Sequence, residues 1–209
     1  MIFDQRNSSN GFSGNDKKFE NNFSCSNEEI ISNYKQYNDS LAQYVKKGLI
    51  SEDQVLLVRN LLKKKDPELA KRLKWQTISY LIKDSNLGVR RIISYALRFY
   101  SDYEKASLLL ISSLKREKDW IVKEEMINSL SEIGLKFEKG NQIREEIELF
   151  ITHFLSDKRH VIRIASIKAV LKLKIIEAKT QLESISILDP VLSVREKALN
   201  VLEDLIDKR

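Results

Sequence analysis

Four segments of the chain repeat one spacing of residue types, and this repetition restricts the fold more than any other feature. Each segment begins with an acidic residue, has a β-branched residue five positions later, and has a basic residue directly after that. The acidic residues are Asp84, Glu117, Asp157 and Asp189. The basic residues are Arg90, Lys123, Arg163 and Arg195. Successive segments start 33, 40 and 32 residues apart, and a period of this length is typical of stacked helical units.

An apolar run with helical spacing precedes each acidic residue. These runs are Ile78–Ile82, Leu108–Leu114, Ile147–Leu155 and Leu182–Leu188. With only 2 prolines and 6 glycines, the chain has few positions that break a helix. Each unit is therefore predicted to be a helix, a short turn and a second helix, and neither helix can bury its apolar side without the next unit. This predicts an all-α fold, an α-solenoid (superhelix) of about four helix pairs over residues 67–209.

At these residues the chain resembles the HEAT-like repeats, especially the variety found in phycobilisome lyases. The resemblance covers about residues 67–206 and implies that the acid, β-branched and basic positions lie on the inner helix of each pair, with acid and base linking successive repeats. It also implies a function, namely that of a bilin lyase subunit or of a chaperone for phycobiliprotein chains. Some DNA glycosylases are similarly built from HEAT-like repeats.

The acidic and basic positions of the four segments are predicted to be structural. An acid in the turn suits the positive end of the following helix and can accept hydrogen bonds from N–H groups of its first turn. A basic residue one turn further can reach the acid of a neighbouring unit. Lys123 is expected to make a weaker contact than the arginines because it lacks a planar guanidinium.

The region before the repeats divides into two parts. Residues 1–26 are rich in Asn, Ser and Gly without apolar periodicity, which predicts a disordered tail. Residues 27–66 are predicted to form helices that cap the array. Capping-box spacings are present at Ser26 with Glu29 and at Ser51 with Gln54, a stop is expected at Gly48, and a new helix is expected after Asp66.

The predicted binding surface lies on the inner helix of the first full repeat. Counting from each basic residue, the helical period predicts that the residues one, two, five, eight and nine positions later are exposed. In the first repeat these are Arg91, Ile92, Tyr95, Arg98 and Phe99. Arginine and aromatic residues predominate in interface hot spots, so we predict a contact surface here. The alternative is that the N-terminal helices cover this patch.

Three further residues complete the predicted partner-binding set. They are Trp120, Lys168 and Lys172. Trp120 stands in a turn, where stacking does not require a large apolar side chain. The corresponding positions of the second repeat, including Glu125, are predicted to be ordinary solvated surface.

Catalytic and metal-binding patterns are missing from the sequence. His153 and His160 have no carboxylate or cysteine at the spacing of a metal site, and Cys25 is the only cysteine. There is no glycine-rich phosphate loop and no nucleophile elbow. We therefore predict no catalytic residues, no metal and no cofactor, unless the chain acts as a bilin lyase.

The leading functional prediction is a non-catalytic scaffold or adaptor that holds a protein partner, possible partners being a second HEAT-repeat subunit or a biliprotein. Nucleic-acid binding is a further alternative, because the net charge of +6 is concentrated in a basic run between Lys63 and Lys74. The single cysteine and the lack of a signal peptide or of a long apolar segment predict a cytoplasmic protein without membrane contact.

Overall fold

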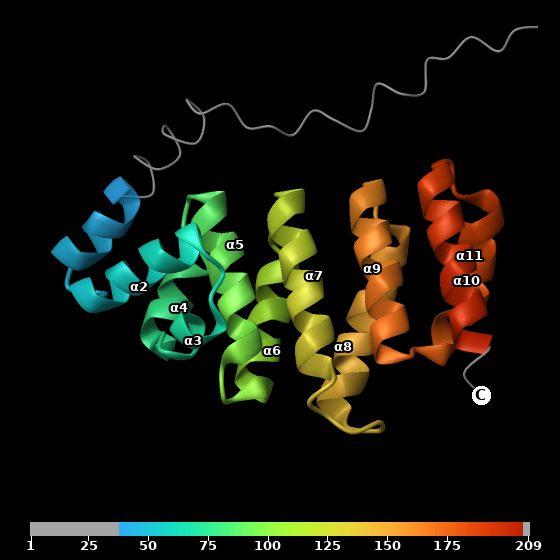
Figure 1. Cartoon of the computed structure of the whole chain (residues 1–209), viewed down its shortest axis with the longest axis horizontal. Helices are drawn as coiled ribbons and strands as arrows, with labels where there is room; N and C mark the ends of the chain where they lie inside the picture. Colours follow the sequence, from blue (N-terminus) through green and yellow to red (C-terminus); the bar gives the residue numbers. More distant parts are fainter. Residues whose placement is uncertain (1–37, 207–209) are drawn as a thin grey trace, which may run out of the picture. The chain divides into compact units, whose positions relative to one another are not determined.

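The computed structural model describes residues 38–206, and this part of the chain contains helices and turns but no strand (Figure 1). A helical stretch at residues 38–46 comes first. The α-helices after it are α2 (Glu52–Lys63), α3 (Pro67–Lys71), α4 (Trp75–Leu81), α5 (Leu87–Ala96), α6 (Tyr103–Leu114), α7 (Trp120–Gly134), α8 (Gln142–His153), α9 (His160–Leu173), α10 (Lys179–Leu188) and α11 (Leu192–Ile206). Short 3-10 segments are η2 (Leu97–Phe99), η3 (Phe154–Ser156) and η4 (Ile176–Ala178). Because these elements are all helical, the prediction of an all-α fold is confirmed for these residues. Within the same range no helix is long and apolar enough to cross a membrane.

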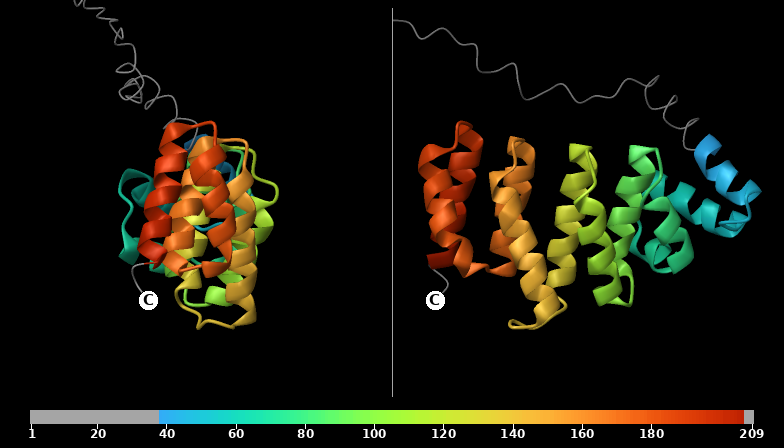
Figure 2. Two further views of the ribbon diagram at one scale, coloured as in Figure 1. Left: turned by 90° about the vertical axis from the view of Figure 1, so that its right-hand side faces the viewer. Right: turned by 180° about the vertical axis from the view of Figure 1, so that it is seen from behind.

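The helices after α3 follow one another as pairs. Each predicted acidic residue lies between the two helices of a pair, in the turns from α4 to α5, α6 to α7, α8 to α9 and α10 to α11. The second helices pack against one another in chain order, α5 on α7, α7 on α9 and α9 on α11. Figures 1 and 2 show these four helices side by side.

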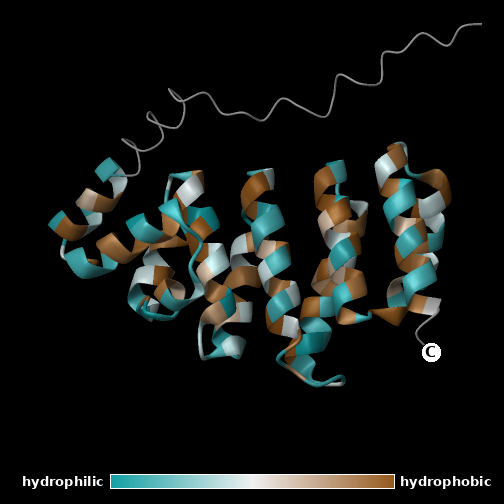
Figure 3. Ribbon diagram, viewed as in Figure 1, coloured by the Kyte–Doolittle hydropathy of each residue, from teal (hydrophilic) through white to brown (hydrophobic). Residues whose placement is uncertain are grey.

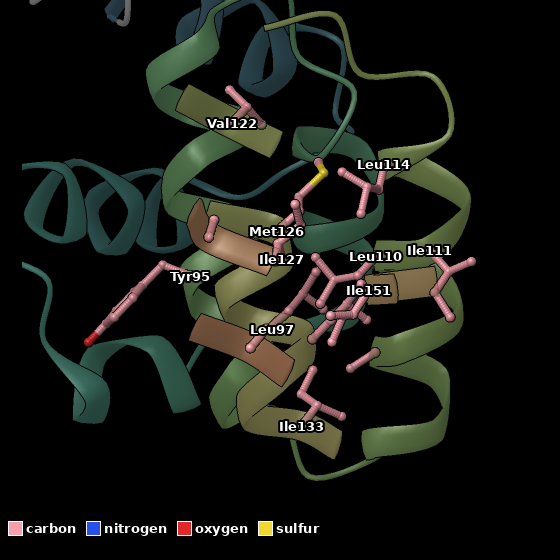
Figure 4. Packing of buried hydrophobic residues seen from close by; sticks show 14 of the residues in the cluster. Tyr95, Leu97, Leu110, Ile111, Leu114, Val122, Met126, Ile127, Ile133 and Ile151 are labelled. Atoms are coloured by element: carbon pink, nitrogen blue, oxygen red, sulfur yellow. The ribbon is translucent and has the colours of Figure 1, made fainter. Parts of the chain in front are cut away.

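The apolar positions of the repeated pattern supply the core between these helices. The β-branched residues Val89, Val122, Ile162 and Val194 are all completely buried. Figure 3 shows that each helix carries both apolar and polar residues, as expected for helices with one buried side. Figure 4 shows Leu97, Leu110, Met126, Ile127 and Ile151 packed together where α6, α7 and α8 meet.

The acidic residue of each turn binds the backbone two residues further along. Asp84 accepts a hydrogen bond from the N–H of Asn86 at 2.7 Å, and Asp189 accepts one from Val191 at 2.9 Å. Glu117 and Asp157 do the same. In α5 and α7 the N–H groups of the first helical turn are instead capped by the N-cap residue, as where Asn86 accepts from Gly88 at 2.8 Å, whereas Arg159 at the N-cap of α9 makes no side-chain cap bond. Our prediction that the acid caps the first turn was therefore wrong, because the turn places the acid before the N-cap position.

Two of the basic residues, Arg90 and Arg163, link their own turn to the next one. Arg90 donates from Nη1 to the carbonyl oxygen of Asp84 at 2.8 Å, and from Nε and Nη2 to both carboxylate oxygens of Glu117 at 2.7 and 3.0 Å. Arg163 binds Asp189 in the same two-pronged way at 2.6 and 2.7 Å. Two planar, charge-assisted hydrogen bonds to one carboxylate fix the relative position of neighbouring turns.

Helices α2 and α3 pack against α5, ahead of the repeated units. Gly48, two residues after the end of the helical stretch 38–46, has a positive φ of 68°, as a helix stop requires. Asp66 caps α3 by accepting from the N–H of Glu68 at 2.9 Å. The capping box predicted at Ser51 does not form, because Ser51 makes no side-chain cap bond. Its expected partner Gln54 is buried and accepts instead from the N–H of Lys74 at 2.8 Å.

Two predictions fall outside the residues that the structure describes. They are the tail at residues 1–26 and the capping spacing at Ser26 and Glu29. Near the beginning of the described range, the Ser40 hydroxyl donates to the Asp84 carboxylate at 2.6 Å. The first acid of the series is thereby paired with the N-terminal part of the array, as the later acids are paired with the preceding repeat.

Candidate functional site

The predicted contact surface on α5 is partly covered. Ile92 is only 3% exposed and Tyr95 only 8% exposed, so the prediction that they face solvent was wrong. The physical reason is that α2 and α3 pack against this side of α5. In Figure 4 the Tyr95 ring points away from the Leu97 and Ile127 side chains of the core. The alternative, in which N-terminal helices cover this patch, therefore agrees with the burial of Tyr95, whose hydroxyl reaches the residues between α2 and α3.

The prediction of solvent exposure is also wrong in the next two repeats, at the position two residues after the basic residue. Glu125 on α7 and Ala165 on α9 occupy this position, and both are buried. Because the following inner helix packs close beside each of these helices, the side of the helix that is covered is broader than a single helical stripe predicts. Exposure at this position is thus lost throughout the first three repeats.

Tyr95 lies between two cations. Its hydroxyl donates to the carbonyl oxygen of Lys65 at 3.3 Å. The Lys65 ammonium lies 5.1 Å and the Arg98 guanidinium 5.2 Å from the centre of its ring, both within cation–π range. Phe99 meets the ring edge to face at a centroid distance of 5.2 Å. Burial raises the pKa of Tyr95 above its usual value, although Arg98 acts in the opposite direction.

Glu125 holds the cations in place from the neighbouring helix. Its carboxylate is buried and is paired with Lys65, with Arg98 and, at 3.4 Å, with Arg91. Arg98 also donates from Nε to the Ser129 hydroxyl at 2.9 Å. A buried carboxylate requires such partners, because an unpaired charge would pay a large desolvation cost. The prediction that Glu125 is ordinary solvated surface was therefore wrong.

We call this group the Glu125 cluster, defined as Lys65, Arg91, Tyr95, Arg98, Phe99 and Glu125. Three cations share one carboxylate, so the cluster carries a net charge of +2. The side chains of Lys65 and Arg91 are 41% and 47% exposed, whereas that of Arg98 is 18% exposed. Two partly exposed cations, Lys65 and Arg91, are therefore held by a buried carboxylate, next to the buried ring of Tyr95.

The other predicted contact residues lie on other elements. Trp120 is the first residue of α7 and is half-buried against the core. Lys168 and Lys172 lie on α9, where Lys168 is exposed and Lys172 pairs with Glu132 of α7. The eight predicted residues are therefore distributed over α5, η2, α7 and α9.

A groove of about 930 Å³ lies at a second place that sequence reasoning missed. Its lining includes Phe150 of α8 and Phe154 of η3, whose rings pack edge to face at 5.6 Å. The ammonium groups of Lys115 and Lys123 lie 5.3 and 5.6 Å from these rings. The signal available in the sequence was the spacing of the two phenylalanines, one helical turn apart.

Within residues 38–206, no three His, Cys, Asp or Glu side chains come together in a way that could hold a metal ion. His153 stacks edge to face on Phe154 at 5.5 Å. No protein-family model matches the sequence, and no curated protein matches it either.

Proposed function

We propose that residues 67–206 form an α-solenoid of HEAT-like helix pairs, and that the chain is a non-catalytic scaffold that binds an acidic segment of a protein partner. The arrangement of α5, α7, α9 and α11 supports the first part, since a base of one unit pairs with the acid of the next at Arg90, Lys123 and Arg163. The Glu125 cluster is the observation that carries the second part.

The charge of the cluster determines the chemistry of the proposed partner. The side chains of Lys65 and Arg91 are partly exposed and are held by Glu125, so they lose little conformational freedom when an anionic group binds. Lys63, the last residue of α2, and Lys64, in the connection that also contains Lys65, are exposed as well. A carboxylate-rich segment complements this surface.

The buried aromatic residues favour a protein over a single-stranded nucleic acid. Base stacking requires an accessible ring, whereas Tyr95 is buried and Phe99 is half-buried beside it. Lys65 and Arg98 already occupy positions over the Tyr95 ring. The ring therefore acts as support for the cations.

The test compares partner recovery by the full chain with that by the variant Lys64→Gln/Arg91→Gln. Both side chains are exposed, so the fold is expected to persist, and circular dichroism with urea denaturation verifies this. The matched control is Lys139→Gln/Lys158→Gln, which removes two exposed cations elsewhere. We expect quantitative mass spectrometry of co-purified proteins to show a several-fold loss of one partner with the first variant only.

Equal recovery by all three proteins would contradict the proposal. A duplex DNA probe distinguishes the nucleic-acid alternative. If the chain binds DNA through this surface, affinity falls steeply between about 50 and 200 mM salt and is reduced in Lys64→Gln/Arg91→Gln. Such a result would identify the partner as a nucleic acid and not a protein.

A further inference from the structure

One side of α11 is exposed where the equivalent side of every earlier inner helix is buried. Leu199, four residues after Arg195, is 50% exposed. The residues four positions after Arg90, Lys123 and Arg163 are all fully buried, and they are Ser94, Ile127 and Ile167. Helices α5, α7 and α9 each have a further inner helix packed beside them, whereas α11 is the last such helix in the described range (Figure 1).

A second large apolar side chain extends this exposed side. Leu192, seven residues before Leu199 and hence two helical turns away on the same side of α11, is 59% exposed. At the end of α10, Ile187 is 75% exposed, whereas Leu155, which likewise precedes its acid by two residues, is buried.

Arg195 has half of its guanidinium available on this helix. Its Nη1 donates to the carbonyl oxygen of Asp189 at 2.6 Å, as Nη1 of Arg90 and of Arg163 does in its own turn. In those two arginines, Nε and Nη2 bind the carboxylate of the next turn. Among residues 38–206, no carboxylate forms an ion pair with Arg195. The guanidinium is therefore oriented by one hydrogen bond, with two further donors left for a carboxylate.

The exposed side of α11 is complementary to itself. If two α11 helices cross in antiparallel orientation at Leu199, residues equally far from the crossing lie opposite one another. Leu199 then packs on Leu199 of the second copy. Arg195, four residues before it, lies opposite Glu203 of the second copy, four residues after it, and the symmetry produces this pair twice. Glu203 is exposed, so it is accessible to such a partner.

We propose that two copies of this chain form a two-fold symmetric dimer through α11, with Leu192 and Leu199 as the apolar seam and two Arg195 to Glu203 ion pairs across it. Opposite charges at fixed register give such an interface its orientation, since like charges placed opposite each other weaken binding. The interface lies at the opposite end of the row of inner helices from the Glu125 cluster, so each copy retains its own cluster.

Sedimentation velocity on the full chain, residues 1–209, over a concentration series tests the dimer. We expect a reversible monomer–dimer equilibrium. Leu199→Asp places a charge at the crossing point and is expected to give only monomer. Because Leu199 is half exposed, the variant should fold, and its circular dichroism and urea midpoint are checked against the wild type.

A charge-swap series tests the register. Arg195→Glu and Glu203→Arg each place like charges opposite one another and are expected to raise the dimer Kd by at least about tenfold. The double variant Arg195→Glu/Glu203→Arg restores opposite charges and is expected to return the Kd close to that of the wild type. The control is Asp204→Arg, an exposed charge reversal one residue further along and turned to another side of the helix, which should leave the Kd nearly unchanged.

Three results would overturn the proposal. The first is a wild-type chain that stays monomeric at all concentrations, as it would if a different polypeptide or a further helix pair covers α11. The second is a dimer that survives Leu199→Asp, which would place the contact on another surface. The third is a double variant as weak as the single ones, which would exclude the antiparallel register.

Discussion

Arg163 binds Asp189 through two hydrogen bonds of 2.6 and 2.7 Å, whereas Lys123 approaches Asp157 no closer than 3.7 Å. The two pairs occupy equivalent positions between successive turns. The arginine pair is almost fully buried, and the lysine pair keeps 22% and 13% of its side chains exposed. The link between α7 and α9 is therefore the loosest of the three base-to-acid links.

Replacement of Lys123 by arginine is expected to tighten this link. The guanidinium can bind both oxygens of Asp157, which an ammonium cannot do from the same position. We expect Lys123→Arg to raise the free energy of unfolding by about 1 kcal/mol, measured by urea denaturation. Lys158→Arg, at an exposed position in the adjacent turn, is the control and should have no effect. Equal or lower stability of Lys123→Arg would mean that the turn cannot accommodate the longer side chain.

Acid should weaken the fold through the two arginine links, Arg90 to Glu117 and Arg163 to Asp189. Burial raises the pKa of Glu117 and of Asp189, but hydrogen bonds from Arg90, Arg163 and backbone N–H groups lower it more, so both values lie below normal. Unfolded Asp and Glu have pKa values of about 3.9 and 4.3. The stabilisation is therefore complete above these values and is lost as the pH falls through the lower pKa values of the folded state.

The measurement is the free energy of unfolding of the wild type and of Arg90→Gln from neutral pH to below pH 3. The wild type should lose stability steeply below about pH 4. Arg90→Gln removes the main cause of the low pKa of Glu117, so its stability should start lower and depend less on pH in this range. Parallel pH curves for the two proteins would show that Glu117 does not contribute.

The stability of the protein at alkaline pH tests the contact between Tyr44 and Asp84 at the N-terminal end of the array. Burial, together with the negative charge and a hydrogen bond of Asp84, raises the pKa of Tyr44 to about 12. An unfolded tyrosine ionises at about pH 10, so the stabilisation is complete below pH 10 and is lost as the pH rises towards 12. Tyr44→Phe should remove this part of the pH dependence. Ultraviolet difference titration of the two proteins checks it, and a Tyr44 that ionises near pH 10 in the folded protein would refute the prediction.

The sequence predicted the features that depend on local spacing. The positions of Arg90 and Arg163 relative to their turns follow from the helical period, because a residue one turn into the helix lies over the turn itself. Helix starts such as Asp66 with Pro67 depend on backbone geometry within a few residues, so they too were predicted correctly.

Features that depend on distant elements could not be predicted from spacing. Gln54 has the sequence context of a capping box, yet its amide oxygen satisfies the N–H of Lys74, 20 residues away. Glu125 and Ile92 lie at positions that a single helix would expose, and they are buried only because other helices pack over them. To predict the Glu125 cluster, one would have to know how α2, α3 and α5 are placed relative to α7. A pattern within one helix does not contain this information.

The Glu125 carboxylate should therefore contribute to stability as well as to the orientation of the cations. Glu125→Gln keeps the shape of the side chain but leaves Lys65, Arg91 and Arg98 without a counter-charge, two of them close to the Tyr95 ring. Removing one partner of a buried ion pair typically costs about 3–5 kcal/mol, and we expect a loss near the lower end because Lys65 and Arg91 are partly solvated. Urea denaturation measures the loss, and Glu124→Gln, at the half-buried neighbouring position, is the control. If Glu125→Gln and Glu124→Gln are equally stable, the cations do not depend on Glu125, and the preorganised surface that we propose for the partner does not exist.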